Sequence, residues 1–160
     1  MRRIILIMSV IVIALASCGG GNKVDSGIFD PVKQAATDES VIQAYIKQNH
    51  IDAEKGPSGL YYQILKEGTG ANATQNSTVK VNYEGKMTDG TVFDSTPAGQ
   101  PASFPLGNVI QGWTMGIPLV KAGGKILLLI PSALGYGEQG GGPIPPNTVL
   151  IFTIDVLSVQ

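Results

Sequence analysis

The sequence predicts an α+β fold in which a twisted antiparallel β-sheet wraps around one short α-helix, preceded by a short helical extension. Short apolar runs recur after residue 60 and predict the strands. The chain has 21 glycines and 10 prolines, most of them after residue 85, and they separate these runs as turns do in a β-rich fold. Only residues 109–120 carry a helical pattern between the strands, which predicts the single helix.

Composition limits both the size of the fold and its partners. The 160 residues are 43% hydrophobic and 14% charged, which is enough for one modest core. Eleven basic and twelve acidic residues give a net charge of -1, without the clustered basic excess that nucleic acids require. A single Cys and a single His exclude an intramolecular disulfide and make a zinc site a poor prediction. We expect one folded domain, with no nucleic-acid partner and no metal.

The first segment, residues 1–17, has the pattern of a secretory signal peptide. Arg2 and Arg3 precede an apolar run, residues 4–16, that is too short to cross a bilayer comfortably as a permanent helix. The run ends in Leu15-Ala16-Ser17-Cys18, a tetrad that resembles the bacterial lipoprotein signal. This resemblance implies that Cys18 is lipidated and becomes the new N-terminus. The alternative is that Cys18 is an incidental small residue in an uncleaved apolar segment.

Residues 18–36 and 37–56 are interpreted as a tether and a helical extension. The tether begins with three glycines after Cys18, a composition suited to a flexible linker. Within residues 38–49, apolar residues recur at helical spacing, and Asp38 is the expected N-cap. The apolar stripe of this helix either packs on its own domain or serves in dimerisation or partner capture. We expect His50 to be a solvated loop residue.

The folded domain is expected to comprise residues 57–160. Residues 60–65 form a β-rich run, and residues 79–84 alternate apolar and polar side chains, as a strand with one buried face does. Asp89-Gly90 favours a hairpin turn, because the glycine readily adopts a positive φ. Residues 125–130 and 148–157 are expected to be the most buried strands.

Six fragments of this domain resemble, in order and approximate spacing, the motifs of the FKBP-type peptidyl-prolyl isomerases. The resemblance covers about residues 60–159, and the ordered set is far more specific than any one fragment. The fragments are Val81-Asn82-Tyr83-Glu84-Gly85, Asp89-Gly90-Thr91-Val92-Phe93-Asp94-Ser95, Val109-Ile110-Gln111-Gly112-Trp113, Ile130-Pro131, Gly135-Tyr136-Gly137 and Ile144-Pro145-Pro146-Asn147-Thr148.

The resemblance implies an FKBP-like fold with a shallow apolar pocket between the sheet and the short helix, and Trp113 as the floor of this pocket. It also implies that the backbone N–H of Ile110 and the phenol of Tyr136 orient the substrate. The residues that match the catalytic lining are Tyr83, Phe93, Asp94, Ile110, Trp113, Tyr136 and Phe152, and those that match further substrate contacts are Val109 and Ile144.

Each of these residues also has a purely structural interpretation. Tyr83 and Phe152 lie at strand positions where an aromatic side chain is often core, and a lone Trp commonly nucleates packing. Asp94 could cap a turn, and Tyr136 could be a surface turn residue. Two departures from the family pattern predict a more open rim: Ala102 replaces an aromatic residue, and residues 96–103 contain no basic partner for Asp94.

The sequence therefore predicts a peptidyl-prolyl cis-trans isomerase of type EC 5.2.1.8 that acts on proline-containing polypeptide clients without a cofactor. Macrolides are the inhibitors implied by the resemblance. The alternative is a tethered, non-catalytic proline-binding module or holdase chaperone that uses the same pocket. Gly19 lacks the acidic character that retains lipoproteins in the inner membrane of some bacteria. We therefore expect a lipid anchor in the cell envelope, at the outer membrane facing the periplasm.

Overall fold

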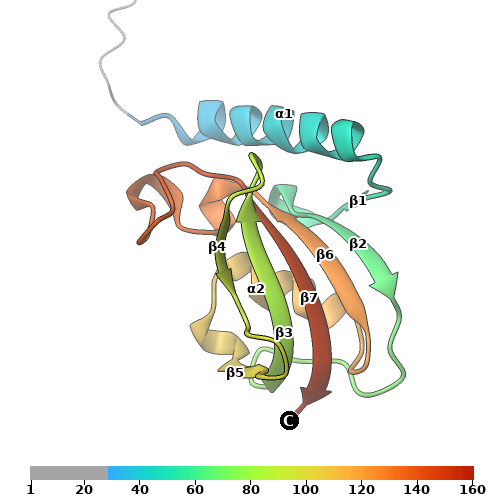
Figure 1. The fold of residues 1–160 in the computed structure, drawn as a ribbon. Coiled ribbons are helices and arrows are strands. Elements are labelled where there is room, and N and C mark those ends of the chain that lie inside the picture. Colours follow the sequence, from blue (N-terminus) through green and yellow to red (C-terminus); the bar gives the residue numbers. More distant parts are fainter. Residues whose placement is uncertain (1–28) are drawn as a thin grey trace, which may run out of the picture.

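The structure of the protein is a computed structural model that describes residues 29–160. Its centre is a seven-stranded sheet in which every pair of neighbouring strands is antiparallel. One short helix, α2, lies against a face of this sheet, and a longer helix, α1, runs across one end of it (Figure 1). The predicted fold class is confirmed. Cys18, the signal segment and most of the expected tether lie outside the described residues.

Helix α1 comprises Pro31–Asn49, so it begins well before the expected N-cap. The N-cap is Asp30, whose carboxylate accepts the backbone N–H groups of Val32 and Lys33. Proline at the first helical position adds a preset φ to this start. The prediction that Asp38 caps the helix is wrong, because Asp38 lies in its middle and is buried. The last residues assigned to the tether are accordingly helical.

The sheet is built from four longer strands and three short ones. The order across the sheet is β1-β2-β6-β7-β3-β4, and β5 pairs with another part of β3. The longer strands are β2 (Tyr61–Lys66), β3 (Thr78–Met87), β6 (Lys125–Ile130) and β7 (Leu150–Val159). The short strands are β1 (Glu54–Lys55), β4 (Val92–Ser95) and β5 (Ala102–Pro105).

The hairpin turn lies where the sequence predicts it, whereas the last strand begins later than predicted. The β3–β4 hairpin turns at Gly90, whose φ is +90°, as the Asp-Gly pair predicts. Strand β7 begins at Leu150, later than expected, because Thr148 belongs to the preceding turn and its hydroxyl donates to the Pro145 carbonyl. Strand β5 was not among the expected strands, and its pairing with β3 is long-range in the chain.

Helix α2 comprises Gln111–Gly116 and continues into a short 3-10 turn. Two of its residues are glycines that face β6. A Cβ atom on Gly112 would lie 2.5 Å from the Ile130 side chain, and one on Gly116 would lie 2.6 Å from Leu128. The absence of side chains at both positions therefore lets α2 approach the sheet closely. This approach fixes the height of the helix above the strands.

The sheet is covered on both faces near α1, and two apolar clusters result. The larger cluster lies between the sheet and α2 and includes Trp113, Leu128 and Phe152. The smaller cluster lies under α1, where Ile42 packs with Leu129 and other side chains. Neighbouring residues of β6 thus point into different clusters, which explains its unbroken apolar sequence. Strands β6 and β7 are the most buried, as the sequence predicts.

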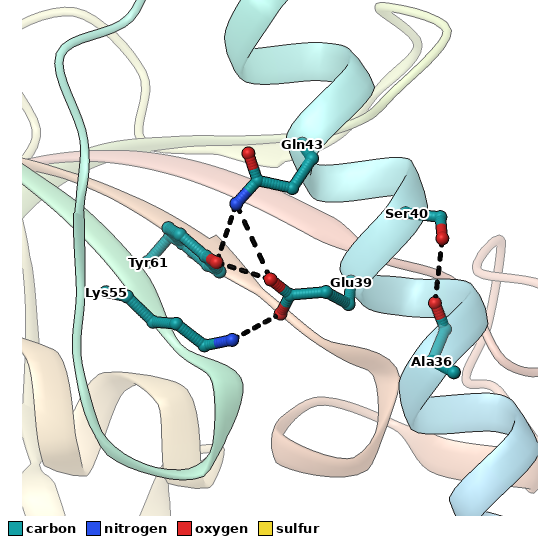
Figure 2. A network of polar contacts seen from close by, with 6 residues as sticks. All are labelled: Ala36, Glu39, Ser40, Gln43, Lys55 and Tyr61. Carbon is teal, nitrogen blue, oxygen red and sulfur yellow. Dashed lines mark hydrogen bonds and ion pairs between the residues drawn. The ribbon is translucent and has the colours of Figure 1, made fainter.

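Helix α1 also docks on its own domain through polar contacts, in addition to the packing of Ile42. Figure 2 shows the carboxylate of Glu39 between Tyr61 and Lys55. The Tyr61 hydroxyl donates to Glu39, Gln43 donates to Tyr61, and Lys55 lies 2.9 Å from Glu39. The hydrogen bond from Tyr61 and the ammonium of Lys55 lower the pKa of the Glu39 carboxyl. The structure thus supports intramolecular packing of the helical stripe. Within residues 29–160, no helix has the length and apolarity needed to cross a membrane.

Candidate active site

A small pocket opens between α2 and the face of the sheet that α2 covers. Its volume is about 100 Å³. Most of its lining is apolar and aromatic, which is typical of a site that binds an apolar group. The lining residues are Tyr83, Phe93, Asp94, Phe104, Val109, Ile110, Trp113, Tyr136 and Phe152.

Trp113 forms the centre of an aromatic cluster at this pocket. Its ring meets the rings of Tyr83, Phe104 and Phe152 edge to face, at centroid distances of 5.1, 5.6 and 5.3 Å. Such edge-to-face pairs place the positive edge of one ring against the negative face of another. Trp113 is 4% exposed, and its Nε1 is buried without a hydrogen-bond partner among the described residues. The indole is therefore held by packing, and its position depends on the surrounding rings.

Tyr83 and Asp94 come from neighbouring strands of the β3–β4 hairpin and form one polar element of the pocket. The Tyr83 hydroxyl donates to Asp94 Oδ2 over 2.6 Å. Burial of the phenol and its hydrogen bond to the carboxylate raise the pKa of Tyr83 well above its ordinary value. Tyr83 thus stays protonated near neutral pH. Asp94 is exposed and serves here as the acceptor that fixes the Tyr83 ring.

The backbone before α2 brings Val109 and Ile110 to the rim. Ile110 is the N-cap, and its carbonyl accepts the N–H groups of Trp113 and Thr114. In the described part of the chain, the Ile110 N–H donates to no protein group. The Thr114 hydroxyl donates to the Leu106 carbonyl and ties the helix to the turn before it. The first turn of α2 therefore presents a backbone donor at the edge of an apolar pocket.

Tyr136 reaches the pocket from the long connection between β6 and β7. Its side chain is 42% exposed, and its hydroxyl has no hydrogen-bond partner among residues 29–160. A Cβ atom on Gly141 would lie 2.8 Å from the Tyr136 ring, so the glycine lets the chain pass close to it. The N–H of Asn147 donates to the Gly137 carbonyl and closes the loop behind Tyr136. The phenol is thus available to a ligand.

The structure brings eight of the nine predicted pocket residues together around one cavity. Ile144 is the exception: it is 6% exposed, packs in the larger apolar cluster and is not part of the lining. Residues 29–160 contain no cluster of His, Cys, Asp and Glu able to hold a metal ion. The predicted lipidation site, Cys18, is outside the described residues.

Sequence reasoning missed Phe104, which stands next to Trp113 at a centroid distance of 5.6 Å. Ala102 marked the loss of an aromatic residue from the rim, but β5 presents Phe104 from the same short strand. The signal was present in the sequence, since Phe104 and Ala102 are two residues apart and share a strand face. The loop between β4 and β5 is held by Thr96, whose hydroxyl accepts the Tyr83 N–H.

The arrangement suits the binding of a compact apolar group under few polar contacts. Aromatic faces and edges form the floor and walls. At the rim, the Ile110 N–H and the Tyr136 hydroxyl are donors without a partner in the part of the chain that the structure describes. Among the described residues, the pocket lining includes no Ser, Cys, His or Lys, so it lacks the usual pairs of nucleophile and base. Chemistry at this site is therefore expected to depend on binding and desolvation.

Comparison with known proteins gives the same grouping. Residues 70–157 match the sequence profile of the FKBP-type peptidyl-prolyl cis-trans isomerases. The chain is 43% identical over 132 residues to the FKBP-type peptidyl-prolyl cis-trans isomerase FkpA of Aeromonas hydrophila, covering 82% of this chain and 48% of that protein. It is 49% identical over 106 residues to the outer membrane protein MIP of Legionella longbeachae, covering 65% of this chain and 46% of that protein.

Solved structures agree with these matches. The crystal structure of FkpA from Escherichia coli superposes with a TM-score of 0.71 at 39% sequence identity, covering 81% of this chain and 62% of that one. The chain spans about half the length of the relatives that it matches. The profile match, the sequence relatives and the fold all lead to the same conclusion: the chain belongs to the FKBP-type peptidyl-prolyl cis-trans isomerase family.

Proposed function

We propose that this protein is a peptidyl-prolyl cis-trans isomerase that accelerates rotation about Xaa-Pro bonds in polypeptides. The observation that carries the proposal is the aromatic pocket around Trp113, with two donors at its rim that have no partner within residues 29–160. Its membership of the isomerase family supports the same activity. The proposed substrates are proline-containing clients of the cell envelope, and macrolides that compete with a prolyl ring are the proposed inhibitors.

The pocket fits the physical requirements of this reaction. Rotation about a prolyl amide has a barrier of ~20 kcal/mol, because the amide loses its resonance as it twists. No covalent bond is made or broken in this rotation. The catalyst must therefore bind the twisted amide better than the planar forms. A twisted carbonyl is less polar than a planar one, and an apolar site therefore desolvates it at a lower cost. The aromatic lining supplies such a site.

Individual residues take separate roles in this proposal. Phe93, Trp113 and Phe152 contact the prolyl ring and exclude water from the amide. The Ile110 N–H and the Tyr136 hydroxyl hold backbone carbonyls of the substrate. Tyr83 contributes a rigid ring because Asp94 fixes its hydroxyl. No residue is assigned a proton transfer.

The test is the cis-to-trans conversion rate of an Xaa-Pro peptide with the purified protein and with its Tyr136→Phe variant. We expect the wild type to accelerate conversion, and Tyr136→Phe to lower kcat/KM about tenfold through the loss of one hydrogen bond. The thermal unfolding midpoint should barely change, because the hydroxyl has no internal partner in the described chain. A well-folded wild type that binds the peptide without accelerating its conversion would contradict the proposal and indicate a proline-binding module.

We further propose that Cys18 is lipidated and anchors the domain in the cell envelope, at the outer membrane facing the periplasm. The supporting observations are the Leu15-Ala16-Ser17-Cys18 tetrad and Gly19 after it. One relative, from Legionella longbeachae, is itself named an outer membrane protein. Labelling with radioactive palmitate should mark the wild type and not Cys18→Ala. In cell fractionation, the variant should be found outside the membrane fraction. Equal labelling of the two proteins would contradict lipidation at Cys18.

A further inference from the structure

A buried carboxylate links helix α1 to the segment that carries Tyr136. Asp38 Oδ2 accepts the Ser132 backbone N–H over 2.8 Å and the Ser132 hydroxyl over 2.7 Å. Its other oxygen accepts Gln34 Nε2 over 2.7 Å. Asp38 is 2% exposed and Ser132 is 1% exposed, and they are the two buried polar side chains of the described residues. A carboxylate buried in this way is stabilised by its donors, so all three contacts constrain its position.

Ser132 is the second residue, after Pro131, of the connection that leads from β6 to Tyr136. It opens a 3-10 turn, Ser132–Leu134, in which the Leu134 N–H donates to the Pro131 carbonyl. The Gly135 N–H donates in turn to the Ser132 carbonyl. Tyr136 follows directly, so the turn transmits the position of Ser132 to the Tyr136 backbone. Asp38 therefore acts on the start of a short, hydrogen-bonded path to the pocket.

Tyr136 depends on this path because few contacts hold its own side chain. Its hydroxyl has no protein partner in the described chain, and its ring is partly exposed. On the far side, the loop is closed by the Asn147 N–H bonded to the Gly137 carbonyl. The backbone of Tyr136 is thus held between one support from within the loop and one from α1.

We propose that Asp38 is a positioning residue for Tyr136: through Ser132, helix α1 sets the placement of the phenol at the rim of the pocket. This inference rests on the proposed isomerase function for its kinetic consequence. It assigns α1 a role in the site, although no α1 residue lines the pocket. A hydrogen bond from a phenol stabilises a transition state only when the donor is aligned, and small displacements are costly.

Other contacts already attach α1 to its domain, so attachment of the helix does not by itself explain the Asp38 contact. Ile42 of α1 is fully buried against the sheet, and the network of Glu39, Gln43, Lys55 and Tyr61 joins the same helix to β1 and β2 (Figure 2). That network does not touch the connection from Ser132 to Tyr136. The two polar anchors of α1 thus offer a matched comparison, because only one of them leads toward the pocket.

The experiment compares Ser132→Ala and Asp38→Ala with the control Tyr61→Phe, each alone and combined with Tyr136→Phe. All are assayed with the full chain at a temperature where every variant is folded. We expect Ser132→Ala and Asp38→Ala to lower kcat/KM about fivefold, the effect of one misplaced hydrogen bond. The loss should vanish in the Tyr136→Phe background, because the phenol through which it acts is gone. Tyr61→Phe should leave kcat/KM unchanged.

A second readout does not require catalysis. Hydrogen exchange at the amides of Leu134 and Gly135 should accelerate in Ser132→Ala and Asp38→Ala, and stay unchanged in Tyr61→Phe. Additive kinetic losses in the double variants, or equal exchange in all three single variants, would overturn the inference. A wild type without isomerase activity would instead refute the proposed function. In that case, the hydrogen-exchange comparison would decide whether Asp38 orders this segment. Peptide affinity, measured through Trp113 fluorescence, would decide whether Asp38 orders the site.

Discussion

Trp113 is buried in the core and also lines the proposed binding pocket, and these two contributions can be separated by substitution. Trp113→Ala should lower the free energy of unfolding by about 3–5 kcal/mol, because the buried indole leaves a cavity. It should also lower kcat/KM by more than about tenfold, because the floor of the pocket is lost. Thermal unfolding and the peptide conversion assay measure the two effects.

Leu129→Ala is the matched control for this prediction. Leu129 is fully buried under α1, on the other side of the sheet from the pocket. The substitution should cost about 2–5 kcal/mol of stability and leave kcat/KM near the wild-type value at temperatures where the protein is folded. An equal loss of activity in both variants would mean that Trp113 acts only through stability.

Tyr83 gives a prediction about pH. Its pKa is raised above the ordinary value of 10.0 by burial and by its bond to Asp94, so the neutral form is favoured in the folded protein. The stability that this shift contributes is complete below the ordinary pKa and is lost only as pH rises through the higher folded value. With no proton transfer in the proposed reaction, kcat/KM should be constant between about pH 6 and about pH 9. A bell-shaped profile within this range would indicate a catalytic acid or base.

At the scale of elements, the contact of α2 with β6 sets the geometry of the pocket. Gly112→Ala would place a methyl group 2.5 Å from the Ile130 side chain, so this side chain or the helix itself must shift. We expect a loss of about 1–3 kcal/mol of stability from this overpacking. The conversion rate should fall as well, because α2 carries Trp113 and Ile110 follows its displacement. Thermal unfolding and the peptide assay test both parts.

Gly107→Ala is the control in the turn before α2. A methyl group there would lie 3.7 Å from its nearest neighbour, the Gln75 carbonyl, which is an ordinary contact distance. We expect little change in stability or activity. If Gly112→Ala behaved like Gly107→Ala, the close approach of α2 would not limit the pocket.

At the scale of the whole molecule, α1 completes the fold by covering one end of the second face of the sheet. Removing residues 1–50 would expose Leu129, Val149 and Ile151, which pack around Ile42. Each such side chain contributes roughly 1.5–3 kcal/mol when buried, so we expect a clearly lower unfolding midpoint and binding of a hydrophobic dye. A chain that begins at Phe29 retains α1 and serves as the control. Equal midpoints for the two shortened chains would contradict this role of α1.

Local patterns predicted the elements whose signals are contained in a few neighbouring residues. The alternation in residues 79–84, the apolar run of β6 and the Asp89-Gly90 turn all match the structure. The start of α1 was missed because Asp38 has the chemistry of an N-cap, and only its buried partner Ser132 reveals its different role. Strand β5 was missed because it forms by pairing with β3, which is distant in the chain, and not through a local sequence pattern.

The candidate site divides in the same way. The family resemblance indicated Trp113, Tyr136 and six other residues that the structure places around one pocket. It did not indicate that Ile144 is core, since burial depends on how the connection between β6 and β7 folds back. Nor did it select Phe104, whose proximity to Trp113 follows from the pairing of β5 with β3.

The sequence by itself determined the fold class, the family resemblance and the chemical character of the pocket, because periodicity, turn residues and ordered motifs are properties of the chain. Only the tertiary structure decided which apolar residues form the pocket and which form the core. It alone joined Asp38 to Ser132 across 94 positions of the chain. Such a contact depends on long-range packing, and the local sequence around either residue contains no trace of its partner.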